Sequence, residues 1–99
     1  MKLFVITKTH FVEDEDTTVS LVGVVTEDEV EETLKVMKKE ILKEFEENYE
    51  EDDLKDLEFT ETSTSVRGFF NCSYDEILVE ATECKLNEID AYGIYDILP

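Results

Sequence analysis

Residues 26–45 read TEDEVEETLKVMKKEILKEF, and this stretch decides the fold. Thr26 and Glu29 have the spacing of a capping box, in which the two residues exchange hydrogen bonds at the start of a helix. One apolar stripe then continues at helical spacing: Val30, Leu34, Met37, Ile41 and Phe45. This period is typical of an amphipathic helix that packs one face against a core. We therefore predict a helix over residues 27–49.

The segments on both sides of this helix have the patterns of β-strands. Residues 2–12 and 19–25 are rich in β-branched and aromatic side chains, and the short polar segment between them indicates a hairpin. After the helix, residues 57–73 continue as extended chain with a bulge at Gly68, and residues 77–86 alternate again. The predicted order is β-β-α-β-β, followed by a C-terminal tail whose apolar residues suit a short helix or a last strand.

This order predicts the α+β fold class. A single domain over residues 1–99 would hold an antiparallel β-sheet, with one long amphipathic helix packed on one face. The length of 99 residues allows one modest core and no second one.

The charge restricts the partners that the protein can bind. The chain has 27 acidic residues against 9 basic ones, which gives a formal net charge of −18. Direct binding to nucleic acid or to an anionic membrane is excluded, because both need basic surface. No apolar run is long enough for a signal-peptide core or a membrane span. We therefore expect a cytoplasmic protein whose partner presents a basic protein surface.

The acidic residues that we predict to bind this partner form two groups. One group is the tip of the first hairpin, and the other follows Lys43 at the end of the helix. Together they comprise Glu13, Asp14, Glu15, Asp16, Glu46, Glu47, Glu50, Glu51, Asp52 and Asp53. Acids at the C-terminal end of a helix oppose its dipole, at about 0.3–1 kcal/mol each. Helix stability therefore does not explain them, whereas binding to a basic surface does.

A rigid acidic protein can also occupy a groove that normally holds nucleic acid, because it gains the same electrostatic attraction. We accordingly predict a DNA mimic that inhibits a host nucleic-acid-binding or defence protein. Two alternatives stay open. The acids could be a generic solvated surface, whose hairpin tip only protects a strand edge from aggregation. They could also bind divalent cations weakly, although neither segment has the glycine and the spacing of a calcium loop.

No residue pattern in the chain predicts catalysis. The single histidine, His10, has the pattern of an ordinary strand residue, and no Ser-His-Asp set or phosphate-binding loop is visible. Cys72 and Cys84 have no neighbouring histidine and are too few for a disulfide framework. We predict no enzymatic activity, no cofactor and no dedicated metal site. Exposed strand edges would allow a homodimer.

Three stretches carry a resemblance to a known group of proteins. They are KLFVIT at residues 2–7, LVGVVTEDEVEETL at residues 21–34 and SYDEILVEATECKLNE at residues 73–88. In these the chain resembles small, uncharacterised acidic proteins encoded by bacteriophages and prophages. The resemblance implies a bacterial cytosol and an inhibitory role, and it implies no catalytic residues.

Overall fold

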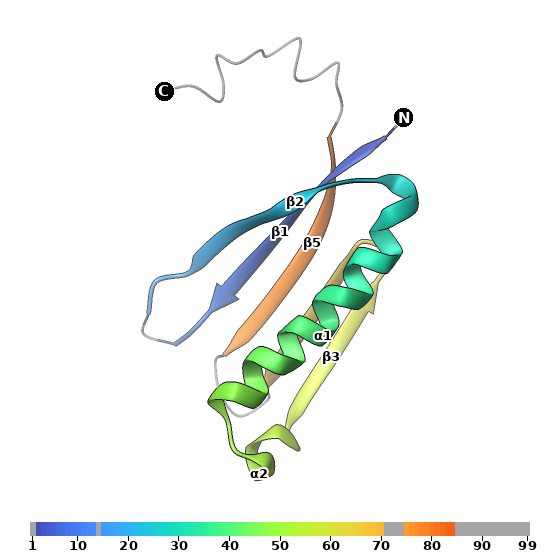
Figure 1. Cartoon of the computed structure of the whole chain (residues 1–99). Helices are drawn as coiled ribbons and strands as arrows, with labels where there is room; N and C mark the ends of the chain where they lie inside the picture. Colours follow the sequence, from blue (N-terminus) through green and yellow to red (C-terminus); the bar gives the residue numbers. More distant parts are fainter. Residues whose placement is uncertain (1, 14, 71–74, 85–99) are drawn as a thin grey trace.

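The computed structural model describes residues 2–13, 15–70 and 75–84 (Figure 1). Five strands form one sheet in the order β2-β1-β5-β4-β3, and all neighbouring strands are antiparallel. In chain order the elements are β1 (Leu3–Phe11), β2 (Thr18–Thr26), a 3-10 turn (Glu27–Glu29), α1 (Val30–Asn48), α2 (Glu51–Leu54), β3 (Leu57–Thr62), β4 (Ser65–Phe70) and β5 (Glu76–Cys84). The predicted α+β fold class is confirmed.

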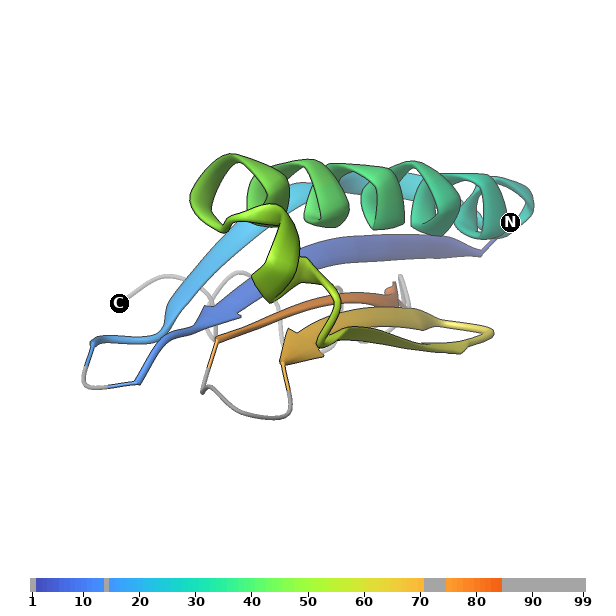
Figure 2. The ribbon, with the colours of Figure 1, turned by 90° about the horizontal axis from the view of Figure 1, so that it is seen from below.

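Helix α1 covers one face of the sheet and forms the core with it (Figure 2). The predicted apolar stripe is the buried face of the helix, with Met37 partly buried at its margin. The sheet supplies Ile6, Val66, Phe70, Ile77, Val79 and Ala81 to the same core. Phe45 contacts Phe70 edge to face, with 5.0 Å between ring centroids. Burial of each such side chain stabilises the fold by about 1.5–3 kcal/mol.

The region after the helix contains one more strand than predicted. The extended segment from residue 57 onward reverses at Ser63 and Thr64, which separates β3 from β4. The Thr62 hydroxyl accepts a hydrogen bond from the Thr64 amide at 3.2 Å and lies 2.7 Å from the Ser65 hydroxyl. Hydroxyl groups close this two-residue turn in place of the Gly or Asn that usually marks one.

The predicted bulge at Gly68 is wrong, because pairing continues regularly from Phe59 through Gly68 to Ile77. Gly68 instead allows α1 to approach the sheet, since a Cβ atom there would lie 2.8 Å from Ile41 Cγ2. The register shift of the sheet lies in β2, where Ile6 pairs with Gly23 and the next residue pairs with Leu21. Val22 is therefore the extra residue of a bulge on an edge strand.

The start of the helix has the predicted capping contact. The Glu29 carboxylate accepts hydrogen bonds from the Thr26 amide at 3.0 Å and from the Thr26 hydroxyl at 2.8 Å. These two bonds, the amide bond first, hold the pKa of Glu29 below its ordinary value. The helix ends at Asn48, one residue before the predicted end, and Tyr49 is extended.

None of the helices in the described ranges is long and apolar enough to cross a membrane. The predicted tail beyond residue 84 lies outside the described residues, as does Cys72, whereas Cys84 is a free, half-buried thiol.

Candidate functional site

The two predicted acidic groups lie at one end of the sheet. Figure 1 shows the tip of the β1–β2 hairpin at the same end as the last turn of α1 and helix α2. We call the described members of both groups the acidic end: Glu13, Glu15, Asp16, Glu46, Glu47, Glu50, Glu51, Asp52 and Asp53. All nine are exposed. Asp14, the tenth predicted residue, lies outside the described residues.

The acids at 50–53 follow the end of the long helix, as predicted, but they also begin a second helix that was not predicted. The chain leaves α1 at Tyr49, and Glu50 becomes the N-cap of α2. The Glu50 carbonyl accepts hydrogen bonds from the Asp53 and Leu54 amides at 3.0 and 3.1 Å. Acids in a first helical turn suit the dipole. Only Glu46 and Glu47 stand at an unfavourable helix end.

The acidic end is almost without internal charge compensation. In the described part of the chain, six ion pairs join a lysine or the arginine to a carboxylate. Asp52, 3.2 Å from Lys55, is the one member of the acidic end in these pairs. The other eight carboxylates form no ion pair within the described ranges. Their negative charge is directed to solvent.

Two lysines of α1 contact side chains that lie outside the acidic end. Lys38 lies 5.2 Å from the centre of the Phe59 ring and 3.0 Å from the Glu61 carboxylate on β3. Lys35 is 3.5 Å from Glu31, one turn nearer the start of α1. Neither partner belongs to the acidic end, so these two lysines pair with acids outside it.

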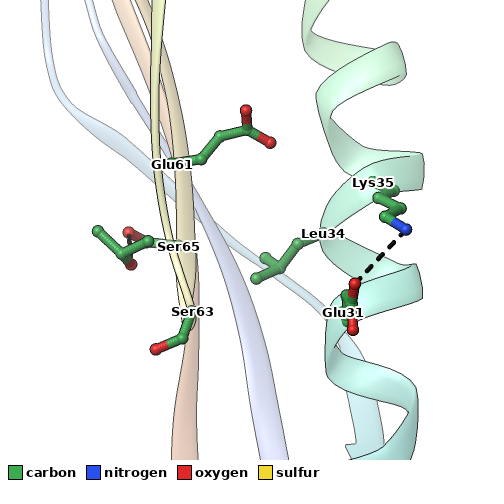
Figure 3. Close-up of a pocket in the computed structure, with 7 residues that line it drawn as sticks. Glu31, Leu34, Lys35, Glu61, Ser63 and Ser65 are labelled. Carbon is green, nitrogen blue, oxygen red and sulfur yellow. Dashed lines mark hydrogen bonds and ion pairs between the residues drawn. The ribbon is translucent and has the colours of Figure 1, made fainter.

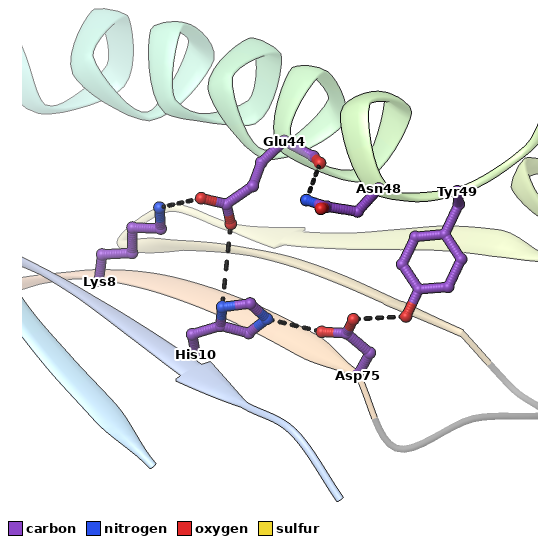
Figure 4. A network of polar contacts seen from close by, with 6 residues as sticks. All are labelled: Lys8, His10, Glu44, Asn48, Tyr49 and Asp75. Carbon is purple, nitrogen blue, oxygen red and sulfur yellow. Dashed lines mark hydrogen bonds and ion pairs between the residues drawn. The ribbon is translucent and has the colours of Figure 1, made fainter. Parts of the chain in front are cut away.

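A polar network ties the last turns of α1 to the sheet (Figure 4). His10 Nε2 lies 2.7 Å from Asp75 Oδ1, and the Tyr49 hydroxyl donates to Asp75 Oδ2 at 2.5 Å. On the other side of the ring, His10 Nδ1 lies 3.9 Å from Glu44 Oε2. The Lys8 ammonium donates to Glu44 Oε1 at 2.9 Å. We call these five residues the His10 network.

The His10 network joins β1 and the residue before β5 to the end of α1, directly before the acids of the acidic end. No local sequence signal predicts it, because His10 and Asp75 are 65 residues apart. Both ring nitrogens face carboxylates, and no serine, threonine or cysteine of the described chain bonds to the ring. Within the described residues, the network connects the end of α1 to β1 and to the start of β5 through side-chain contacts.

Two surface hollows flank α1. The first, of about 330 Å³, lies where the start of α1 faces the β3–β4 hairpin, and Figure 3 shows Leu34 and Lys35 opposite Glu61 and Ser63. The second, of about 480 Å³, has a lining that includes Lys8, Glu44 and Glu47. Neither lining contains a histidine or a cysteine, and no metal-binding cluster of His, Cys, Asp or Glu exists among the described residues.

Comparisons with protein-family models, curated proteins and solved structures found no match to this chain. The resemblance to phage-encoded proteins and the bacterial cytosol therefore stay predictions.

Proposed function

We propose that this protein has no enzymatic activity and binds a positively charged surface of a partner protein through its acidic end. The observation that carries the proposal is the uneven distribution of ion pairs. Eight exposed carboxylates at one end have no pair, although the described chain forms six pairs elsewhere or with Asp52. Uncompensated charge of one sign attracts a partner of opposite sign and accelerates its association.

Rigidity supports the same proposal. Acids on a flexible segment would lose conformational freedom on binding, which weakens the complex. The His10 network instead connects the end of α1 to β1 and to Asp75, the residue before β5, through contacts of 2.5–2.9 Å. The acids of α1 and α2 thus follow a fixed point of the fold, as a preorganised surface requires.

The finer proposal is that the basic surface is a groove that normally holds nucleic acid. DNA presents one negative charge about every 1.7 Å along its axis, and the proteins that bind it contact these charges with lysine and arginine side chains. An acidic end of this kind would compete for such a groove. In a bacterial cell infected by a phage, the protein would then inhibit a nucleic-acid-binding or defence protein of the host.

The test compares two variants with the same change of charge. In the first, the acids of the acidic end at positions 50–53 become amides: Glu50→Gln, Glu51→Gln, Asp52→Asn and Asp53→Asn. In the control, four exposed acids elsewhere become amides: Glu32→Gln, Glu40→Gln, Glu80→Gln and Glu83→Gln. Each protein is used to capture partners from bacterial lysate at about 50 mM and about 500 mM salt, since exposed charge pairing is screened at high salt.

We expect the original protein and the control to capture a basic protein at low salt and to release it at high salt. The variant at positions 50–53 should not capture it. Equal capture by both variants would mean that net charge alone attracts the partner, and the acids would then be a solvated surface. A captured nucleic-acid-binding protein that is displaced by added DNA would support the mimic.

A further inference from the structure

Strand β2 forms an edge of the sheet and has an unusual composition for an edge. Its nine residues, TVSLVGVVT, contain no charged side chain, in a chain of which 36% is charged. Val19, Leu21 and Val24 are 65%, 69% and 56% exposed. Edge strands of soluble proteins usually present charge or proline, because an open apolar edge pairs with other chains.

The register shows which face these side chains occupy. Lys8 of β1 donates a hydrogen bond to Glu44 of α1, and His10 lies 3.9 Å from the same carboxylate, so the residues that alternate with them point to the opposite, helix-free face. Leu21 pairs with Thr7 and Val19 pairs with Thr9, which places both on that face. Among the described residues no helix covers them. An apolar strip of β2 therefore lies directly beside a strand edge that pairs with no other strand of the described residues.

Acidic residues stand at both ends of this strip. Glu13, Glu15 and Asp16 precede β2 in the hairpin tip, and Glu27 and Asp28 follow it. Lys2, at 3.9 Å, pairs with Glu27, whereas Asp28 forms no ion pair in the described chain. The outer edge of β2 is thus apolar in its middle and negative at its ends.

This charge pattern disfavours a second copy of the chain as the occupant. An antiparallel pair of β2 strands would place the hairpin tip of one copy against Glu27 and Asp28 of the other, twice. A parallel pair would place tip against tip. Either arrangement brings carboxylates of like sign together, which is destabilising across strands. A segment with basic residues at its ends would meet no such repulsion.

We propose that the outer edge of β2 accepts an extended segment of the partner protein as an added strand. The segment has apolar residues at alternate positions, which contact Val19, Leu21 and Val24, and lysine or arginine at both ends. Main-chain hydrogen bonds supply affinity in this mode of recognition, and alternate side chains supply specificity. The bulge at Val22 restricts the register, because an added strand must follow the bend. The inference rests on the proposed function, since it takes the basic partner from there.

The experiment uses the full chain and three synthetic peptides of the length of β2. The first has an alternating valine and threonine core with lysines at both ends. The second has the same core with glutamates at its ends, and the third has lysines but prolines at alternate core positions, which removes main-chain donors. Hydrogen exchange of the amides of Thr18–Thr26 is followed by nuclear magnetic resonance with each peptide in excess.

We expect the lysine peptide to slow exchange of the outward-facing amides of β2 by about tenfold or more, because new hydrogen bonds protect them. The glutamate and proline peptides should give no protection. Leu21→Lys should abolish the effect, and its fold should survive because Leu21 lies outside the core. Val19→Thr, a milder change of the strip, should weaken the protection.

Four results would overturn the inference. They are equal protection by the lysine and glutamate peptides, no protection by any peptide, complete protection of the outward amides in the free protein, and protection that rises with protein concentration alone. The third result means that another part of the chain occupies the edge, and the fourth means that a second copy does.

The two proposals fail separately. The amide variant at positions 50–53 should keep peptide binding at β2 while it loses capture of the basic partner. If it keeps both, the proposed function is wrong and strand addition stands. Conversely, if no peptide gives protection, strand addition is wrong while salt-dependent capture by the acidic end still stands.

Discussion

The two edges of this sheet are built differently. The edge strand β3 lies against the core cluster, with Leu57 and Phe59 packed against it, and Glu58 and Glu61 add charge. The opposite edge strand, β2, has no charge and packs against the core only through Val25, while Val19, Leu21 and Val24 are exposed. The β3 edge thus packs on the core and has charges that hinder pairing with other chains, while the β2 edge leaves apolar side chains exposed to solvent. The fold therefore depends on the sequence of β3 more than on that of β2.

The largest effect should come from the packed side of the molecule. Phe45→Ala removes a ring that is 1% exposed and contacts Phe70, so we expect a loss of about 3–5 kcal/mol in the free energy of unfolding. Leu21→Ala, on the exposed edge, should change it by less than about 0.5 kcal/mol. Urea unfolding measures both. Comparable losses would show that β2 is packed and would remove the contrast between the edges.

Gly68, beneath α1, and Gly23, on the edge strand β2, compare the packed and the exposed regions with smaller expected changes in stability. A Cβ atom at Gly68 would lie 2.8 Å from Ile41 and 2.9 Å from Phe59, so Gly68→Ala should cost about 1–3 kcal/mol through overpacking. A Cβ atom at Gly23 of β2 meets no atom within 4 Å. Gly23→Ala should leave stability unchanged or raise it by up to about 1 kcal/mol, because it restricts the unfolded chain. Thermal unfolding of the two variants measures both changes in stability. A stabilising Gly68→Ala would contradict the close approach of α1.

The packed part of the fold could be predicted from the sequence because its signals are local. The stripe from Val30 to Phe45 repeats at helical period, and Thr26 and Glu29 mark its start within four residues. The turn at Ser63 and Thr64 escaped prediction because its closing bonds come from hydroxyl groups, which are also common within strands. The bulge at Gly68 was predicted wrongly because a glycine in a strand can indicate either a bulge or the close approach of a neighbouring element.

The candidate site could be predicted only in part. Charge density alone identified the acidic residues, and the nine that the structure describes are exposed. The end of α1 was predicted to within one residue, whereas the short helix α2 was missed, because four residues are too few to show a helical period. The His10 network joins residues that are far apart in the chain, so only the paired strands and the helix bring them together. A single sequence contains no signal for such contacts.

A substitution in the His10 network tests whether this network holds the acidic end in place. Tyr49→Phe removes the hydroxyl that donates to Asp75 at 2.5 Å. We expect a loss of about 1.5 kcal/mol, the lower limit for a hydrogen bond to a charged group. A double-mutant cycle with Asp75→Asn isolates the coupling between the two side chains. Hydrogen exchange should quicken in α2 and stay unchanged in the middle of β2, and the reverse pattern would contradict this role of the network.

The acidic end itself contains a comparison between two helix ends. Glu47 lies in the last turn of α1, whereas Glu51 lies in the first turn of α2. Both substitutions to lysine relieve the net negative charge equally, so their difference reports the dipole. Glu47→Lys should exceed Glu51→Lys in stability by about 0.3–1 kcal/mol at low salt. The difference in melting temperature should shrink with added salt, and a difference of the opposite sign would contradict the break between α1 and α2.

The smallest effect concerns Glu29, at the junction of β2 and α1. Hydrogen bonds from the Thr26 amide and hydroxyl lower its pKa in the folded protein. A folded pKa below the unfolded one means that this carboxylate stabilises the fold above the unfolded pKa, and that the contribution disappears as pH falls through the folded pKa. Glu29→Gln should therefore lower the melting temperature at neutral pH and converge with the original protein in acid. The control is Glu32→Gln, which removes an exposed carboxylate without such bonds and should change the melting temperature less at neutral pH. If both variants have the same pH profile, net charge and not the capping contact sets the acid sensitivity of this junction.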